Sequence, residues 1–165
     1  MTDLPRSQQP GEAAWRAIDP YRERVDIFGD PDELLSDFKA VPAAVGHLLA
    51  VWWCNSEVCN GGFHQFFSNS TGILAPEALA GYRSIGSVHC SELVESAIRM
   101  FGSDFPRDRD SRFARLSELE GPGDRREDWD PFYLLDDKYY AAKRMENLFA
   151  MMDQYALETA GLTNG

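Results

Sequence analysis

The run from Val45 to Cys54 is the part of this sequence that most constrains the fold, because it must be buried in a folded protein. Almost all of its side chains are apolar, so a helix made from it would have no polar face to turn toward water. Pro42 precedes it and suits the start of a helix, because the first helical positions have no use for an amide hydrogen. Asn60-Gly61-Gly62 follows it, and these residues accept the left-handed conformation that ends helices. The sequence predicts a buried central helix over residues 42–59.

The rest of the chain also shows helical rather than strand periodicity. Asp30-Pro31 is a strong helix start, because aspartate can cap the free amides and proline fits the first turn. Apolar residues recur at steps of three and four, and no run alternates as a half-buried strand would. We therefore expect an all-α fold of about six to eight helices around the central one, with the others over residues 12–28, 31–38, 63–69, 76–86, 87–101, 113–119 and 136–160.

The length of 165 residues fits a single domain. Residues 1–11 are polar and carry two prolines, which predicts a disordered leader before one compact domain over residues 12–165. The start of the chain lacks the apolar core of a secretory signal, and no apolar run reaches the ~18 residues of a membrane span. Together with three cysteines in no disulfide-scaffold pattern, this predicts a cytoplasmic protein.

The stretch after the central helix gathers an unusual set of polar, aromatic and glycine residues. We expect the carboxylate of Glu57 to fold back over the glycine turn and accept hydrogen bonds from the amides that begin the next helix. The same residues could instead form a binding or catalytic pocket, with Glu57, Asn60, Gln65 and Asn69 as its polar groups. We call the whole set the signature corner; it comprises Glu57, Asn60, Gly61, Gly62, Phe63, Gln65, Phe66, Phe67, Asn69 and Gly72.

Three kinds of chemistry find little support in the sequence. The spacings among His47, Cys54, Cys59 and His64 differ from the close pairs of structural zinc sites, so no metal is expected. No cysteine lies in a recognisable nucleophile signature, and no catalytic residue is assigned. Asn60-Gly61-Gly62 lacks the pattern of a phosphate-binding loop. We expect no cofactor.

The formal charge is −11, from 16 basic and 27 acidic residues. Such a charge disfavours direct contact with nucleic acid or anionic membrane and favours a basic partner. Acidic residues one helical turn apart are ~5.4 Å apart along the axis, so a row of them can imitate a line of phosphates. An ordinary solvated surface is the alternative. The candidates form two clusters, Asp26, Asp30, Asp32, Glu33 and Asp37 near one end, and Asp124, Glu127, Asp128, Asp130, Asp136 and Asp137 near the other.

The signature corner also carries a resemblance. The stretch from Glu57 to Gly72 reads E-V-C-N-G-G-F-H-Q-F-F-S-N-S-T-G and resembles the E-V-x-N-G-G-F-x-Q-F-F-x-N-x-x-G signature of the bacterial DNA-mimic protein family, a domain of otherwise unknown function. Leu79 to Gly86 and Leu134 to Tyr140 resemble two later elements of that family. The resemblance covers roughly residues 30–160.

This resemblance implies an all-helical, acidic, cytoplasmic protein that forms a dimer. In the family's named member, negative charge arranged as in DNA is presented to a helix-turn-helix transcription factor. We therefore expect a non-enzymatic interaction module that binds a basic protein such as a DNA-binding regulator. The alternative is a small enzyme or ligand-binding protein that uses the polar pocket of the signature corner.

Overall fold

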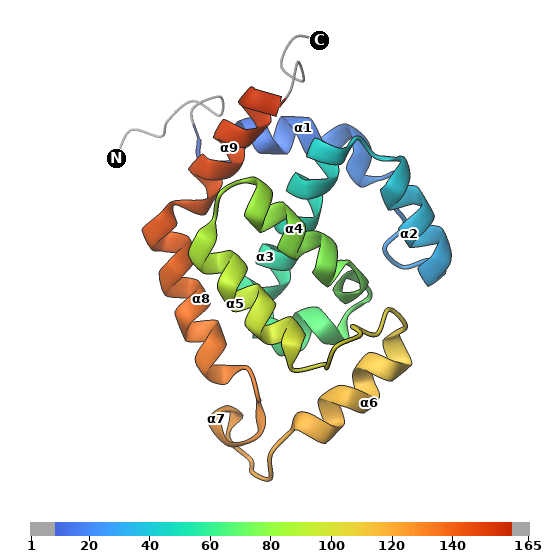
Figure 1. Cartoon of the computed structure of the whole chain (residues 1–165), viewed down its shortest axis with the longest axis vertical. Helices are drawn as coiled ribbons and strands as arrows, with labels where there is room; N and C mark the ends of the chain where they lie inside the picture. The colour runs from blue at the N-terminus through green and yellow to red at the C-terminus, as the bar shows by residue number, and fades with distance from the viewer. Residues whose placement is uncertain (1–8, 160–165) are drawn as a thin grey trace.

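The computed structural model describes residues 9–159, and this part of the chain is all-α, as predicted, with no strand (Figure 1). It contains nine α-helices and a short 3₁₀ helix, η2. In chain order these are α1 (Glu12–Arg22), α2 (Pro31–Ala40), α3 (Ala43–Ser68), η2 (Ser70–Leu74), α4 (Ala75–Ser84), α5 (Val88–Arg99), α6 (Arg109–Leu119), α7 (Arg126–Trp129), α8 (Tyr133–Glu146) and α9 (Leu148–Thr159).

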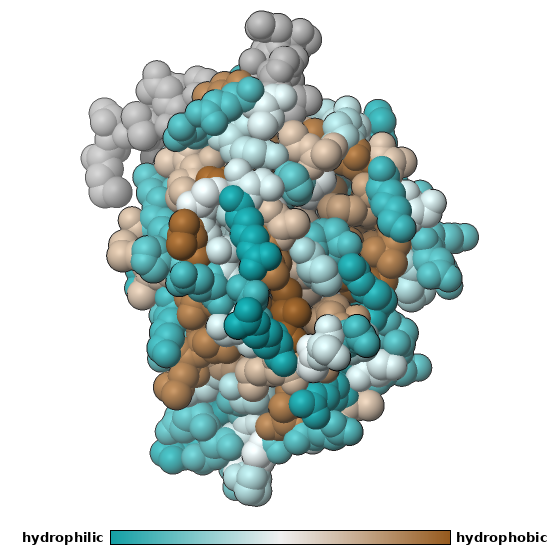
Figure 2. Space-filling model, in the orientation of Figure 1, coloured by the Kyte–Doolittle hydropathy of each residue, from teal (hydrophilic) through white to brown (hydrophobic). Residues whose placement is uncertain are grey.

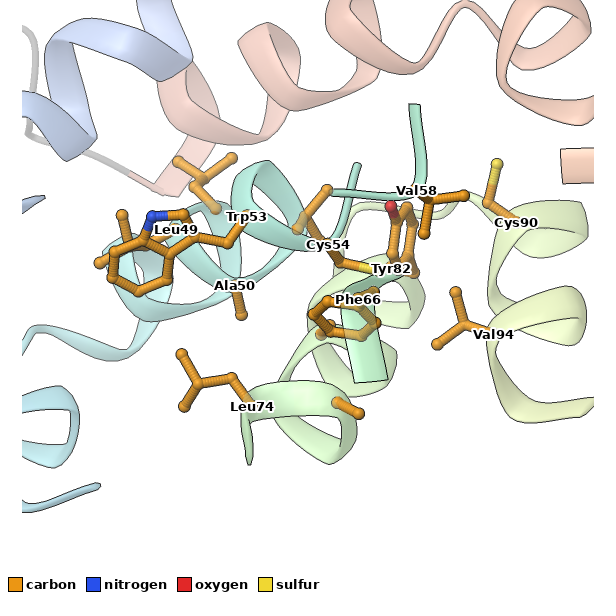
Figure 3. Close-up of a cluster of buried hydrophobic side chains, with 14 of the residues drawn as sticks. Leu49, Ala50, Trp53, Cys54, Val58, Phe66, Leu74, Tyr82, Cys90 and Val94 are labelled. Atoms are coloured by element: carbon orange, nitrogen blue, oxygen red, sulfur yellow. The ribbon is translucent and has the colours of Figure 1, made fainter. Parts of the chain in front are cut away.

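Helix α3 is the predicted central helix, and the others surround it (Figure 1). It packs against α1, α2, α4, α6, α8 and α9. Its apolar run is buried along nearly its whole length, as expected for a helix without a polar face. Figure 3 shows Leu49, Trp53 and Cys54 of α3 in one hydrophobic cluster with Tyr82 of α4 and Val94 of α5.

The helix count exceeds the expected six to eight for two physical reasons. The predicted last helix divides into α8 and α9 at Asn147, whose φ of 53° and ψ of 58° are left-handed, a conformation that asparagine tolerates. The charged run before α8 forms the four-residue helix α7. By contrast, α1 ends at Arg22, soon after Pro20, and does not reach Phe28, because proline removes a hydrogen bond from the ladder.

Hydrogen bonds join α9 to the start of α1. The carboxylate of Asp153, in α9, accepts hydrogen bonds from the amides of Gly11 at 2.7 Å and Ala14 at 3.0 Å. These amides belong to the first turn of α1, which has no cap of its own. Most of the predicted leader, residues 1–8, lies outside the described residues, but Gly11 is buried against α9 and belongs to the folded part.

None of the helices within residues 9–159 has both the length and the hydropathy needed to cross a lipid bilayer.

A second long-range cap joins α8 to α5. Glu146, the last residue of α8, accepts hydrogen bonds from the Ser87 hydroxyl at 2.5 Å and the His89 amide at 2.7 Å, where α5 begins. Burial opposes ionisation of Glu146, but these hydrogen bonds outweigh it and lower the pKa to about 2. The ionised carboxylate thus stabilises the fold.

We predict that Glu146→Gln lowers the free energy of unfolding at neutral pH by about 2 kcal/mol, because charged hydrogen bonds to the start of α5 are lost. A lowered pKa in the folded state contributes stability above the unfolded value of about 4.5, and this is lost as pH falls toward 2. The difference in free energy of unfolding between wild type and Glu146→Gln, measured by urea denaturation, should therefore decrease as the pH falls from about 4.5 toward 2. Glu92→Gln, on the exposed face of α5, is the control and should change stability little at any pH.

Candidate functional site

The signature corner is a break inside α3, at Gly61 and Gly62. Gly62 has φ 80° and ψ −179°, a conformation that is essentially restricted to glycine, and the helix resumes at Phe63. A Cβ on Gly62 would lie 2.2 Å from both Arg126 Nη2 and Asp136 Oδ2. The predicted helix stop is therefore confirmed as a kink between two helical segments, and side chains from α7 and α8 fill the space beside it.

Asp136 caps the second segment of α3. Its Oδ1 accepts a hydrogen bond from the Phe63 amide at 2.8 Å, and its Oδ2 contacts Arg126 Nη2 at 2.5 Å. The residue is 1% exposed. Burial raises the pKa of Asp136 to about 6, although the Phe63 amide and Arg126 both favour the ionised form. The prediction that Glu57 caps this segment is therefore wrong. The acceptor is Asp136 of α8, because α8 passes the kink on the side to which the Phe63 amide points.

Glu57 faces side chains instead of backbone. Its Oε2 accepts hydrogen bonds from Gln65 Nε2 at 2.7 Å and Asn69 Nδ2 at 2.8 Å. Its Oε1 accepts one from Thr71 Oγ1 at 3.2 Å. One half-buried carboxylate therefore joins the first segment of α3, the second segment and η2.

This network forms the floor of a pocket of about 420 Å³. Each amide side chain has two N–H groups and one oxygen, so Gln65 and Asn69 each keep a donor and an acceptor beyond the bond to Glu57. Asn60 lies exposed at the pocket and is absent from the network. The lining is completed by Ile27, Phe28, Ser70, Thr71 and Arg109. The structure thus brings together all four polar residues predicted for a pocket.

The other members of the signature corner are structural. Phe63, Phe66 and Phe67 are fully buried. A Cβ on Gly72 would lie 2.5 Å from the Phe66 carbonyl oxygen, so the backbone of η2 passes too close to α3 for any larger residue.

The first acidic cluster is fully on the surface. Asp26, Asp30, Asp32, Glu33 and Asp37 are all exposed, and none forms an ion pair with another residue of the described range 9–159. We call this set the 26–37 acidic segment. It covers the loop before α2 and α2 itself, at the edge of the molecule where hydrophilic residues gather in Figure 2. Asp30 also caps α2 as predicted, accepting from the Asp32 and Glu33 amides.

An exposed aromatic side chain lies within this segment. Phe28 is 87% exposed, and the Asp26 carboxylate accepts a hydrogen bond from its amide at 3.0 Å. A large apolar group in water is informative when polar groups surround it, because such groups anchor protein interfaces. The apolar periodicity had predicted a helix over residues 12–28 that ended at Phe28, so this residue was not predicted as a site residue.

The second acidic cluster is partly neutralised and partly buried. Asp130 and Asp136 are buried, and both carboxylates contact Arg126, so we remove them from the candidate binding surface. Glu127 and Asp128 are exposed but pair with Arg125 at 2.9 and 3.1 Å. Asp124 and Asp137 are exposed without an ion pair to a described residue. Arg125 and Arg126 thus pair with four of the six acidic residues of this cluster.

Two arginines that sequence reasoning passed over hold the site together. Arg126 bonds Asp130 and Asp136, and its four-residue spacing from Asp130 on a helix was a usable signal. Arg112 is 1% exposed and donates to the carbonyl oxygens of Phe67 and Asn69 at 3.0 Å each. Burial lowers the pKa of Arg112 to about 10. No sequence pattern predicts that an arginine will donate hydrogen bonds to backbone carbonyl groups of another helix.

The histidines and cysteines considered as metal ligands are dispersed. His47 contacts the Tyr155 hydroxyl at 2.8 Å, and His64 contacts Glu120 at 2.8 Å. Cys54 is buried in the core. Within residues 9–159 no group of three or more histidine, cysteine or acidic side chains is arranged to hold a metal ion.

Comparison with known proteins adds one finding. The family model described as DMP19-like protein matches residues 39–159, a span that contains the whole signature corner and every helix from α3 to α9. No curated protein and no solved structure gives a significant match to this chain.

We predict that Gly62→Ala lowers the free energy of unfolding by about 3 kcal/mol or more, because it adds backbone strain and displaces Arg126 and the buried Asp136. Gly102→Ala is the matched control. Gly102 also has a positive φ, 103°, but a Cβ there meets no atom within 4 Å, so the loss should be only about 1 kcal/mol. Chemical denaturation measures the free energy of unfolding of both variants. Equal losses would show that the contacts at the kink contribute nothing.

Proposed function

We propose that this chain, which belongs to the DMP19-like protein family, is a non-enzymatic interaction module that binds a basic protein through the 26–37 acidic segment. The partner in this proposal is a cytoplasmic DNA-binding regulator, sequestered from its DNA site by charge that imitates a DNA backbone. The observation that carries the proposal is a set of five exposed carboxylates that form no ion pair with a described residue.

The geometry of this segment supports the proposal. Glu33 and Asp37 are four residues apart on α2, about one helical turn, and Asp30 precedes them on the same helix start. Lys39 is the single basic residue of α2. Unpaired carboxylates at regular spacing attract a cationic surface from a distance and raise the rate of encounter. Phe28, beside them, supplies apolar area that charge alone lacks.

The test compares two triple variants that remove the same charge. Asp32→Asn/Glu33→Gln/Asp37→Asn should weaken partner binding at least about tenfold, because each charged contact contributes about 0.5 kcal/mol or more. Asp124→Asn/Glu127→Gln/Asp128→Asn should bind nearly as wild type, because two of these three acids, Glu127 and Asp128, already pair with Arg125. Neither variant changes Asp26 or Asp30, which order the local backbone.

Binding is measured by capture of proteins from lysate of the source cells at low and high salt. A captured basic DNA-binding protein that is released by high salt and by added duplex DNA would support the proposal. Equal loss of the partner with both triple variants would mean that net charge alone governs binding. Absence of any charge-dependent partner would refute the proposal.

A second candidate function rests on the pocket over Glu57. Buried polar networks usually serve structure, but here Gln65 and Asn69, each with a donor and an acceptor not used by Glu57, line a pocket of about 420 Å³. Such a pocket suits a small polar ligand, bound by hydrogen bonds on its floor and flanked by Phe28 and Arg109.

For this pocket we predict that a ligand found by thermal-shift screening of polar metabolites binds the Asn60→Ala variant at least about tenfold more weakly, since one hydrogen-bonding side chain is lost. Asn60 is exposed and outside the Glu57 network, so the free variant should melt as wild type does. Ser56→Ala, exposed on the same helix and outside the pocket lining, is the control. A ligand that binds wild type, Asn60→Ala and Ser56→Ala with equal affinity would have to bind outside this pocket.

A further inference from the structure

An exposed cysteine and a lysine meet between α3 and α8. Lys143 Nζ lies 2.9 Å from Cys59 Sγ, although the two residues are 84 positions apart in the sequence. Cys59 lies in the last turn of the first segment of α3, two residues before the glycine kink at Gly61. The thiol and the amine are the two most nucleophilic side-chain groups of this region, and they already touch.

Both groups are held in place by their neighbours. Lys143 Nζ lies 5.5 Å from the centre of the Phe149 ring, a cation–π distance. The Tyr140 hydroxyl, one turn before Lys143, donates to the Val58 carbonyl at 2.8 Å and fixes α8 against α3 at this level. The Cys59 thiol lies 3.5 Å from Asn55 Oδ1. The short distance between sulfur and nitrogen therefore reflects the packing of two helices.

The other two cysteines provide a contrast. Cys54 and Cys90 are buried among apolar side chains in the cluster of Figure 3. Burial raises the pKa of the Cys90 thiol to about 12 and that of Cys54 well above its ordinary value. Since the thiolate is the reactive form and an oxidant must reach it, these two thiols are protected. Cys59 is the exposed member of the three.

We propose that Cys59 and Lys143 form a reversible covalent crosslink when the protein meets hydrogen peroxide. The Cys59 thiolate attacks one peroxide oxygen; an S–O bond forms, the O–O bond breaks, and the leaving hydroxide takes a proton to become water. Sulfur is oxidised to a sulfenic acid and peroxide is reduced. Lys143 Nζ, after releasing its ammonium proton to solvent, then attacks the sulfur. An S–N bond forms, the S–O bond breaks, and the hydroxide leaves as water with a proton from nitrogen.

The product is a sulfenamide that joins the first segment of α3 to α8. Its formation from a sulfenic acid and an amine needs no second oxidant, and an external thiol reverses it by attacking sulfur and releasing the amine. The lysine thereby protects Cys59 from further, irreversible oxidation. The link also fastens the backbone immediately before the kink that shapes the signature corner.

The test treats the full chain with a small excess of hydrogen peroxide and maps peptides from a protease that cuts at acidic residues. The expected product is a Cys59–Lys143 crosslinked pair whose mass is two hydrogen atoms below the sum of the two peptides. Dithiothreitol should restore both peptides, and crosslinked protein should melt at a higher temperature. Lys143→Arg keeps the charge but cannot close the link, so its Cys59 should accumulate as sulfinic acid.

Two control variants separate this reaction from general oxidation. Lys138→Arg, also on α8 but absent from the contact, should crosslink as wild type does, and Cys59→Ser should give no crosslink. Formation of the same oxidised species at the same rate in wild type and Lys143→Arg would overturn the proposal. So would oxidation of wild type that leaves Lys143 unmodified.

Discussion

The fold depends on one hydrogen bond, from the Phe63 amide to the Asp136 carboxylate. Without an acceptor, the amide that restarts α3 after Gly61 and Gly62 would be buried and unpaired, which costs about 1–3 kcal/mol. Asp136 satisfies it and is itself compensated by Arg126. The kink in α3 is therefore held by side chains from both α7 and α8. Gln65, Asn69 and Thr71, the partners of Glu57, lie beyond the kink, so their positions depend on it.

The acidic residues of this chain have two different physical roles. Asp136, Glu146 and Asp153 cap helices that lie far away in the sequence, and each stabilises the fold through backbone amides. The carboxylates of the 26–37 acidic segment form no ion pair with a described residue, and only Asp26 and Asp30 accept hydrogen bonds from backbone amides. Their mutual repulsion is a cost. This unfavourable charge, beside the exposed Phe28, supports the proposal that a basic partner binds here.

Local signals in the sequence predicted local structure well. The buried helix after Pro42, the Asp30 cap and the break at the double glycine were all readable from residue types and spacing, because each depends on a few neighbouring residues. Partners distant in sequence could not be read in this way. Asp136 was taken for surface charge, since nothing near it reveals an amide 73 positions earlier. The convergence of Gln65, Asn69 and Thr71 on Glu57 likewise needed the path of η2.

The cap that Asp153 places on α1 also bears on how the chain is completed during synthesis. Helix α1 emerges early, yet the acceptor for its Gly11 and Ala14 amides belongs to α9 and is made last of all the capping carboxylates. Until then its first turn has no partner but water, and the apolar face of α1 has no α9 to cover it. Among the described helices, α1 is therefore made first but can complete its cap only after α9 has been made.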